Sequence, residues 1–170
     1  PSTGSGPLFG GMLIAPGRIE SDGLPLLPAI VTAYRTSNYR TVESVPLPKH
    51  LYKFKVLVPK GREELVYPVF QQALEVTFGL KVRREMREAD VFVLRPGPEK
   101  GKGLPPSKAN ESSERHDKGF LRAKKQPIKK LVDLLEGMFL RAPVVDETGL
   151  TAEYDWELPY NRASNNVLLD

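Results

Sequence analysis

In the sequence Tyr-Lys-Phe-Lys-Val at residues 52–56, large apolar side chains alternate with charged ones. Successive side chains of a strand point to opposite faces, so this period of two predicts a strand with one buried and one solvated face. The same form returns at residues 154–158 as Tyr-Asp-Trp-Glu-Leu. We expect the aromatic side chains of both stretches, Tyr52, Phe54, Tyr154 and Trp156, to pack in a core.

The surroundings of the two stretches are also alike. Tyr52 follows Val42 by ten residues, and Tyr154 follows Val144 by the same interval. An apolar stripe at helical spacing precedes each of the two valines. The chain therefore carries a duplicated β-α-β-β unit, and two such units can each bury one face of their sheets.

Three apolar stripes predict three principal helices. The first runs from about Leu26 to Arg35 with an N-cap at residues 21–23, the second from Val66 to Phe78, and the third starts at Pro127. Short strands are predicted in residues 11–21, 39–42, 144–145 and 152–158, and a β-hairpin is predicted from residues 81–87 and 90–94. The expected fold class is α+β, with three main helices packed on antiparallel sheet.

The length of 170 residues suits one domain, which we place at residues 11–160 between a flexible tail at 1–10 and a C-terminal tail at 161–170. Residues 96–125 hold many prolines, glycines and charges and few apolar side chains, which predicts a mobile basic insertion. This segment and the start of the third helix carry an excess of lysine and arginine, whereas the rest of the chain is slightly acidic. Such a segment either stays solvated or meets nucleic acid or an anionic surface.

Two motifs resemble those of a known family. Residues 80–88, Leu-Lys-Val-Arg-Arg-Glu-Met-Arg-Glu, with Val-Phe-Val-Leu at 91–94, resemble one hallmark of a soil-associated, acidobacterial-type family of unknown function. The second hallmark, Pro-Val-Val-Asp-x-Thr-Gly-Leu-Thr-x-x-Tyr-Asp, stands at residues 143–155, with Ala152 where the family usually has glycine. The resemblance implies an exported protein, sometimes fused to BlaR-like membrane metallopeptidases, and a likeness to the short N-terminal domains of secretins and TonB-dependent receptors. It implies no catalytic residues.

The second motif supplies the candidate site residues, whose role the sequence leaves open: Asp146, Thr148, Gly149, Tyr154 and Asp155. One interpretation is a small-ligand or cation site that uses the carboxylate oxygens. The other is a turn in which Asp146 accepts local N–H groups and Gly149 adopts a positive φ. A calcium loop needs about 6–8 oxygens in a spacing that this segment lacks, which favours the turn.

Signatures of catalysis are missing from the sequence. It has no cysteine, so thiolate metal sites and disulfides are excluded, and its two histidines, His50 and His116, are far apart. No zinc-protease, serine-hydrolase or phosphate-loop pattern occurs, and no apolar run reaches the length of a membrane span. We expect no catalytic residues, cofactor or metal, although a pair of carboxylates from an unrecognised hydrolase can assemble without a local motif.

The leading functional prediction is a non-catalytic protein-binding module of the cell envelope, an accessory or sensor domain in the periplasm or outside the cell. Open sheet edges carry unpaired N–H and C=O groups, which can recruit a partner protein by strand addition. The alternatives are a basic nucleic-acid or anionic-surface binder and an unrecognised hydrolase. The sequence indicates neither the partner nor the oligomeric state.

Overall fold

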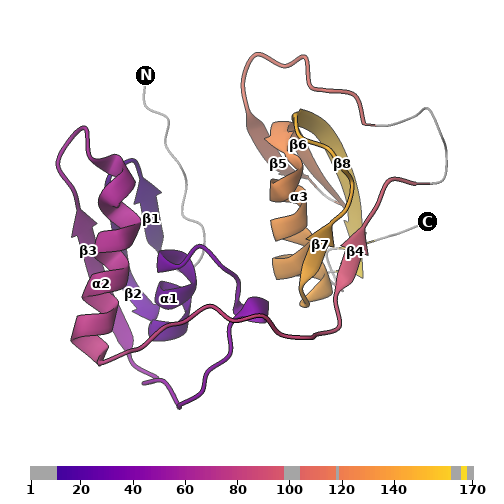
Figure 1. Cartoon of the computed structure of the whole chain (residues 1–170). Coiled ribbons are helices and arrows are strands. Elements are labelled where there is room, and N and C mark those ends of the chain that lie inside the picture. The colour runs from indigo at the N-terminus through magenta and orange to yellow at the C-terminus, as the bar shows by residue number, and fades with distance from the viewer. Residues whose placement is uncertain (1–10, 98–103, 118, 162–165, 168–170) are drawn as a thin grey trace. The chain divides into compact units, whose positions relative to one another are not determined.

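The computed structural model describes residues 11–97, 104–117, 119–161 and 166–167, and the chain forms two compact units. Unit 1 comprises residues 1–87 and unit 2 residues 88–170 (Figure 1). The structure thus has two units where the sequence analysis predicts one domain over residues 11–160. The reason is that each hydrophobic core is built from residues of one unit alone. The predicted α+β class is confirmed.

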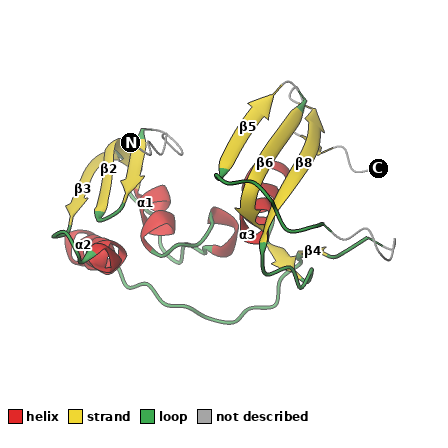
Figure 2. Ribbon diagram, turned by 90° about the horizontal axis from the view of Figure 1, so that it is seen from above, coloured by secondary structure: helices red, strands yellow, loops and turns green. Residues whose placement is uncertain are grey.

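Unit 1 is a three-stranded antiparallel sheet with two helices. Strands β1 (Met12–Ala15), β2 (Arg18–Pro25) and β3 (Leu51–Leu57) lie in the order β1-β2-β3. Helices α1 (Leu26–Ala33) and α2 (Val66–Phe78) complete the unit, as Figure 2 shows. The core joins apolar side chains from all these elements, including the fully buried Ile19, Leu26, Phe70 and Leu74.

The helix boundaries of unit 1 follow from local backbone chemistry. Pro25 ends β2 in extended conformation and directly precedes α1, which suits a residue that lacks a backbone N–H. Gly79 ends α2 at φ +63°, a left-handed conformation that favours glycine, as the sequence predicts. Two 3₁₀ turns, η1 (Asn38–Arg40) and η2 (Glu63–Leu65), lie in the connections.

Unit 2 contains a larger antiparallel sheet and a small parallel one. Strands β5 (Ser113–Asp117), β6 (Phe120–Pro127), β8 (Glu153–Asn161) and β9 (Asn166–Val167) form the first, in that order. Strands β4 (Phe92–Leu94) and β7 (Val144–Asp146) pair in parallel. Helix α3 (Ile128–Leu134) continues as the π-helical segment η3 (Leu135–Leu140). Leu121, Ala123, Tyr154 and Trp156 are buried in its core.

The predicted duplication holds residue for residue along the sheets. In unit 1 Leu24 pairs with Tyr52, and in unit 2 Gln126 pairs with Tyr154, so residue n corresponds to residue n + 102. The same shift relates the hairpins β1–β2 and β5–β6, the starts of α1 and α3, and a β-bulge near residues 22–24 and 124–126. The hairpin glycines Gly17 and Gly119 also correspond, with φ +69° and +84°. Aromatic side chains of both alternating strands pack in or against the cores, as predicted.

The predicted hairpin at residues 81–87 and 90–94 is wrong. Residues 79–91 form no regular element, and β4 pairs in parallel with β7 about fifty residues later in the chain. Residues 88–89, Glu-Ala, provide no side chain suited to the positive φ of a tight hairpin turn. The charges of residues 81–88 also leave no apolar face to bury, and Met86 is fully exposed.

Two smaller expectations for unit 1 are also corrected. Residues 39–42 form the turn η1 and a loop rather than a strand, because no neighbouring strand offers them a ladder in the described residues. Residues 21–23 do not cap α1, because they lie within β2, and Gly23 adopts φ +147° at the bulge. The residue at the cap position is Pro25.

The basic insertion predicted at residues 96–125 contains two strands of the sheet. β5 lies wholly inside it, β6 begins inside it, and Leu121 and Ala123 are fully or almost fully buried. Charged residues outnumber these two buried side chains in the segment, so its composition does not indicate that it contributes to a core. Residues 98–103 and Lys118 lie outside the described residues.

Of the two predicted tails, the structure describes only part of the C-terminal one, residues 161–170. Residues 1–10 lie outside the described residues. Within residues 161–170, Asn161 ends β8, and β9 pairs back onto Tyr160 and Asn161. Part of the expected C-terminal tail is therefore sheet.

Candidate functional site

The outer edge of β8, the edge that faces away from β6, is occupied by other parts of unit 2. Pro106 forms an antiparallel bridge with Tyr154, and the Ser107 N–H donates to the Glu153 carbonyl at 2.8 Å. The Ser107 hydroxyl donates to the Asp155 carboxylate. At the other end of the strand β9 pairs with Tyr160 and Asn161. An extended segment of the chain thus satisfies edge groups of β8.

The outer edge of β3 is the corresponding edge of unit 1. In the part of the chain that the structure describes, β3 pairs only with β2, so its other edge has no strand beside it. Leu51 and Leu57, at its two ends, are 67% and 57% exposed. Leu51 corresponds to Glu153, whose carbonyl accepts the Ser107 N–H in unit 2. The backbone groups that receive a segment in unit 2 therefore have no strand partner in unit 1 among the residues that the structure describes.

Charges on the solvent face of the two sheets are reversed between the units. In unit 1 the edge strand β3 carries Lys53 and Lys55, opposite the acidic Asp22 and Glu20 of β2. In unit 2 the corresponding residues have the opposite sign: Asp155 and Glu157 on β8, and Lys124 and Arg122 on β6. Arg122 lies opposite Glu157 as Glu20 lies opposite Lys55, whereas Lys124 and Asp155 lie where the register shifts at the β-bulge. The strand that carries Lys53 and Lys55 in unit 1 is thus basic, and its counterpart in unit 2 is acidic.

Ion pairs and pKa shifts follow this reversal. Lys55 Nζ lies 3.1 Å from Glu20, and Arg122 pairs with Glu157 at the corresponding position. Lys53 Nζ lies 2.6 Å from Asp22, and the hydrogen bond to this carboxylate raises the pKa of Lys53. Hydrogen bonds from Arg18 and then Lys55 lower the pKa of Glu20. These shifts favour the charged forms of Lys53 and Glu20.

Three of the sequence-predicted site residues meet in one turn. The Asp146 carboxylate accepts the Thr148 N–H at 2.9 Å and the Thr148 hydroxyl at 2.7 Å. The Thr148 hydroxyl oxygen accepts the Leu150 N–H at 3.1 Å, and Gly149 adopts φ +70°. Each of these contacts is local, which is the geometry of the turn interpretation.

The other two predicted residues lie on β8, away from that turn in the hydrogen-bond network. Tyr154 is buried, and its hydroxyl oxygen accepts the Ala152 N–H at 3.2 Å. Asp155 accepts the Lys125 N–H of the bulge at 2.9 Å in addition to the Ser107 hydroxyl. These hydrogen bonds, first that from Ser107, lower the pKa of Asp155. Asp155 therefore holds the edge segment of unit 2 in place.

Three basic residues on β6 and α3 pair with carboxylates of the same unit. Arg122 contacts Asp117 and Glu157, Lys129 lies 2.7 Å from Asp133, and Lys130 lies 3.2 Å from Glu114. The nucleic-acid alternative stays a prediction.

Histidines and carboxylates form no metal-binding cluster in the described residues. His116 contacts Glu114 at 2.9 Å, whereas the ring of His50 packs edge-on to Tyr52. Over the same described ranges, no helix is both long and apolar enough to cross a membrane.

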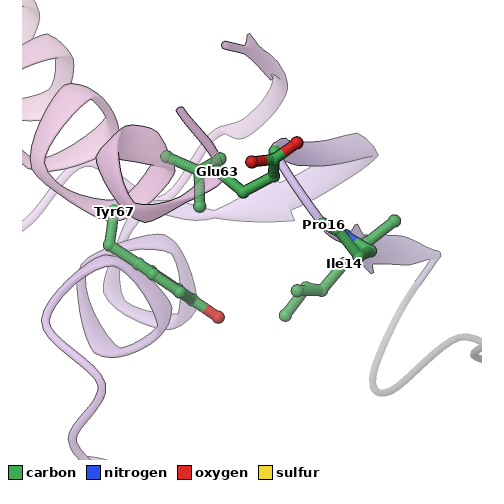
Figure 3. A pocket seen from close by; sticks show the side chains of 7 residues that line it. Ile14, Pro16, Glu63 and Tyr67 are labelled. Carbon is green, nitrogen blue, oxygen red and sulfur yellow. The ribbon is translucent and has the colours of Figure 1, made fainter. Parts of the chain in front are cut away.

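A shallow hollow of about 310 Å³ lies in unit 1 between the β1–β2 turn and the start of α2 (Figure 3). Ile14, Pro16 and Tyr67 line it together with Glu63. The Gly61 N–H donates to Glu63 at 2.9 Å, and this bond lowers the pKa of Glu63, which keeps the carboxylate ionised. Apart from Glu63 and Tyr67, the residues that line the hollow are apolar or glycine.

The occupied edge of β8 and the open edge of β3 distinguish the units most clearly, and neither is predicted from the sequence. Residues 104–107, Leu-Pro-Pro-Ser, fall in the predicted insertion, because two prolines exclude regular structure. The sequence does hold one signal, the alternation of apolar and charged residues. Aligning residues 52–56 with 154–158 places lysines opposite carboxylates, which shows the reversal of charge without any structure.

Together these observations define an α+β protein built from two related units, one of which has an occupied sheet edge. A family model described as "Protein of unknown function (DUF3738)" matches residues 29–167. The chain belongs to this family. No curated protein and no solved structure matches the chain.

Proposed function

We propose that the chain is a non-catalytic protein-binding module, in which the outer edge of β3 pairs with an extended segment of a partner protein. The observation that carries this proposal is the comparison of two equivalent edges. β8 is paired through Pro106 and Ser107, whereas β3 has no strand beside it in the described residues. An edge strand is a template for a further strand, because its outward N–H and C=O groups lack ladder partners.

The geometry of unit 2 indicates how a partner segment would lie. The bridge between Pro106 and Tyr154 is antiparallel, so the partner segment runs antiparallel to β3. Its backbone N–H donates to the Leu51 carbonyl, as Ser107 donates to Glu153. Apolar side chains at its two ends cover the exposed Leu51 and Leu57. Main-chain hydrogen bonds then supply affinity, and alternate side chains supply specificity.

We also propose that the module acts in the cell envelope, as an accessory or sensor domain. The support is the resemblance of residues 143–155 to an exported family. Fractionation of cells that produce the native protein should place it in the periplasm, the envelope or the medium. Recovery in the cytosol alone would contradict this location.

The edge is tested with a displayed library of seven-residue peptides selected on the whole chain. Selected peptides should slow amide hydrogen exchange in β3 and leave the rest of unit 1 unchanged. Each selected peptide is then synthesised with N-methyl groups on alternate amides. Strand pairing predicts that methylation of the amides that face β3 abolishes binding, whereas methylation of the other set does not.

A variant pair locates the binding on the protein. Leu51→Pro removes an edge N–H at the first residue of β3, where proline is tolerated and where the β2 partner is itself a proline. It should weaken peptide binding at least tenfold, a loss of about 1.4 kcal/mol. Val76→Ser, an exposed apolar position on α2, is the matched control and should bind as the parent does. Equal binding by the proline variant, or protection confined to other elements, would refute the proposal.

A further inference from the structure

The reversal of charge between the two edges carries an inference about the partner. We propose that β3 selects an acidic extended segment of the form apolar-x-acidic-x-acidic-x-apolar. This inference rests on the proposed strand pairing and names the chemistry of the segment that pairs. Four side chains of β3 point to the solvated face of the sheet at alternate positions: Leu51, Lys53, Lys55 and Leu57.

The register of antiparallel pairing determines which residue of the partner lies opposite each of these four side chains. In antiparallel pairing, directly opposed residues place their side chains on the same face, about 4.5–5.5 Å apart at Cβ. A segment that runs antiparallel to β3 therefore meets Leu57, Lys55, Lys53 and Leu51 with its first, third, fifth and seventh residues. Carboxylates at the third and fifth positions face the two ammonium groups, and apolar side chains at the ends face the leucines.

In unit 2 the side chain at the position of Lys53 forms a hydrogen bond with the segment that covers the edge. Asp155, which corresponds to Lys53, accepts a hydrogen bond from the Ser107 hydroxyl of the paired segment. A lysine has three donors and no acceptor, so Lys53 needs an acceptor from its occupant in place of a donor. The side chain of the occupant that contacts Lys53 is therefore one that accepts, and an ionised carboxylate is the strongest such group.

The acidic residues of β2 do not cancel the preference of Lys53 and Lys55 for an acidic partner. Lys53 pairs with Asp22 and Lys55 with Glu20, but Arg18 also contacts Glu20, so the solvated face of the two strands holds three cations and two anions. The ammonium of Lys53 is largely exposed, with 78% of its side chain accessible, so it can contact a second carboxylate from the open side of β3. An incoming lysine would meet Lys53 and Lys55 before it met an acid.

Three blocked peptides test the inference on the native chain: Leu-Thr-Glu-Thr-Glu-Thr-Leu and its counterparts with glutamine or lysine at both glutamate positions. Binding is measured by NMR titration of the β3 amides at low and at high salt. We expect the glutamate peptide to bind roughly three- to tenfold more tightly than the glutamine peptide, from two cross-strand charge pairs, and the lysine peptide to bind most weakly. The differences should shrink at 1 M salt.

A charge-exchanged variant sharpens the test. Glu20→Arg, Asp22→Lys, Lys53→Asp and Lys55→Glu together give unit 1 the residues that unit 2 has at these positions, so opposed charges are retained. The order of the peptides should reverse, with the lysine peptide binding most tightly. Circular dichroism establishes that the variant is folded, and Lys53→Gln with Lys55→Gln serves as a second variant, in which the preference should vanish.

The outcomes separate this inference from the proposed function. Equal binding of the glutamate and glutamine peptides, with protection of β3, would overturn the acidic selection and leave strand pairing intact. An unchanged preference for glutamate in the exchanged variant would likewise overturn the inference, because the charge would then come from elsewhere. Failure of all three peptides to perturb β3 would overturn the strand pairing itself.

Discussion

Units 1 and 2 share one frame and differ in what is attached to it. Both have a β-hairpin, a bulge, a helix that starts after a proline, and a returning strand, β3 or β8, with aromatic side chains at two corresponding positions. Unit 1 adds α2, which contributes Phe70 and Leu74 to the core. Unit 2 adds the β4–β7 pair and the segment that covers β8. The frame is therefore compatible with different coverings, and the proposed function lies where a covering is missing, at the outer edge of β3.

The valine that lies ten residues before the shared tyrosine is buried in one unit and exposed in the other. Val144 is 2% exposed in β7, whereas its counterpart Val42 is 60% exposed. Val144 packs with Leu94 and with side chains of α3, and Phe92–Leu94 supplies its strand partner. In the described part of unit 1, residues 41–46 have no such strand beside them. The same valine is buried or exposed according to the element that its unit adds.

The largest expected effect tests whether the two cores are separate. Phe70→Ala removes a ring that is 1% exposed and should destabilise unit 1 by about 3–5 kcal/mol. Because the only tryptophan, Trp156, lies in unit 2, its fluorescence reports on that unit alone. In urea, the far-ultraviolet circular dichroism should begin to change at lower concentration, while the midpoint of the tryptophan transition stays where it was.

Leu121→Ala is the matched variant in unit 2, where Leu121 is fully buried. It should lower the tryptophan midpoint by the equivalent of about 2–5 kcal/mol. A shift of the tryptophan midpoint by Phe70→Ala of similar size would contradict separate cores and would mean that the units unfold together.

The second prediction concerns the residues that hold the added elements. Glu136, which is 4% exposed, accepts the Val144 N–H at 2.9 Å and so links η3 to β7. Glu136→Ala leaves a buried N–H without this acceptor and should destabilise unit 2 by about 1–3 kcal/mol in the tryptophan-monitored transition. Glu136→Gln keeps an acceptor oxygen and should recover most of that loss. Equal losses in the two variants would show that the charge, not the hydrogen bond, is what matters.

How far the sequence predicts this molecule depends on the range of the interaction. Alternation at residues 52–56 and 154–158, the apolar stripes and Gly79 each depend on neighbouring residues, and the strands and helices they predict are present. The β4–β7 pairing joins residues about fifty positions apart, and a pattern in one segment does not indicate its distant partner. Burial of Leu121 and Ala123 beneath a charged hairpin face is invisible to composition for the same reason.

In the candidate site, too, local contacts are predictable from the sequence and long-range contacts are not. The turn at Asp146 is local, so the identity and spacing of Asp146, Thr148 and Gly149 suffice to predict it. The contacts of Asp155 join Ser107, Lys125 and β8, which only the fold brings together. The charge reversal was visible in the aligned stretches, but its meaning required knowledge of which strand edge is occupied.

The smallest effect concerns Tyr34, which occupies in unit 1 the position of Glu136. Its hydroxyl donates to Glu75 of α2, and burial, followed by this hydrogen bond, raises the pKa of Tyr34 to about 12. A raised tyrosine pKa means that folding favours the neutral form, so the stabilisation is present below the unfolded value near 10 and is lost as the pH rises through 12. Absorbance at about 295 nm should therefore show one tyrosine that titrates near pH 12. This step should disappear in Tyr34→Phe and move to lower pH in Glu75→Gln, while the tryptophan fluorescence of unit 2 stays unchanged across the same step. If the late step survives in Tyr34→Phe, the hydroxyl does not link α1 to α2 in the way its partner Glu75 indicates, and the parallel with Glu136 fails.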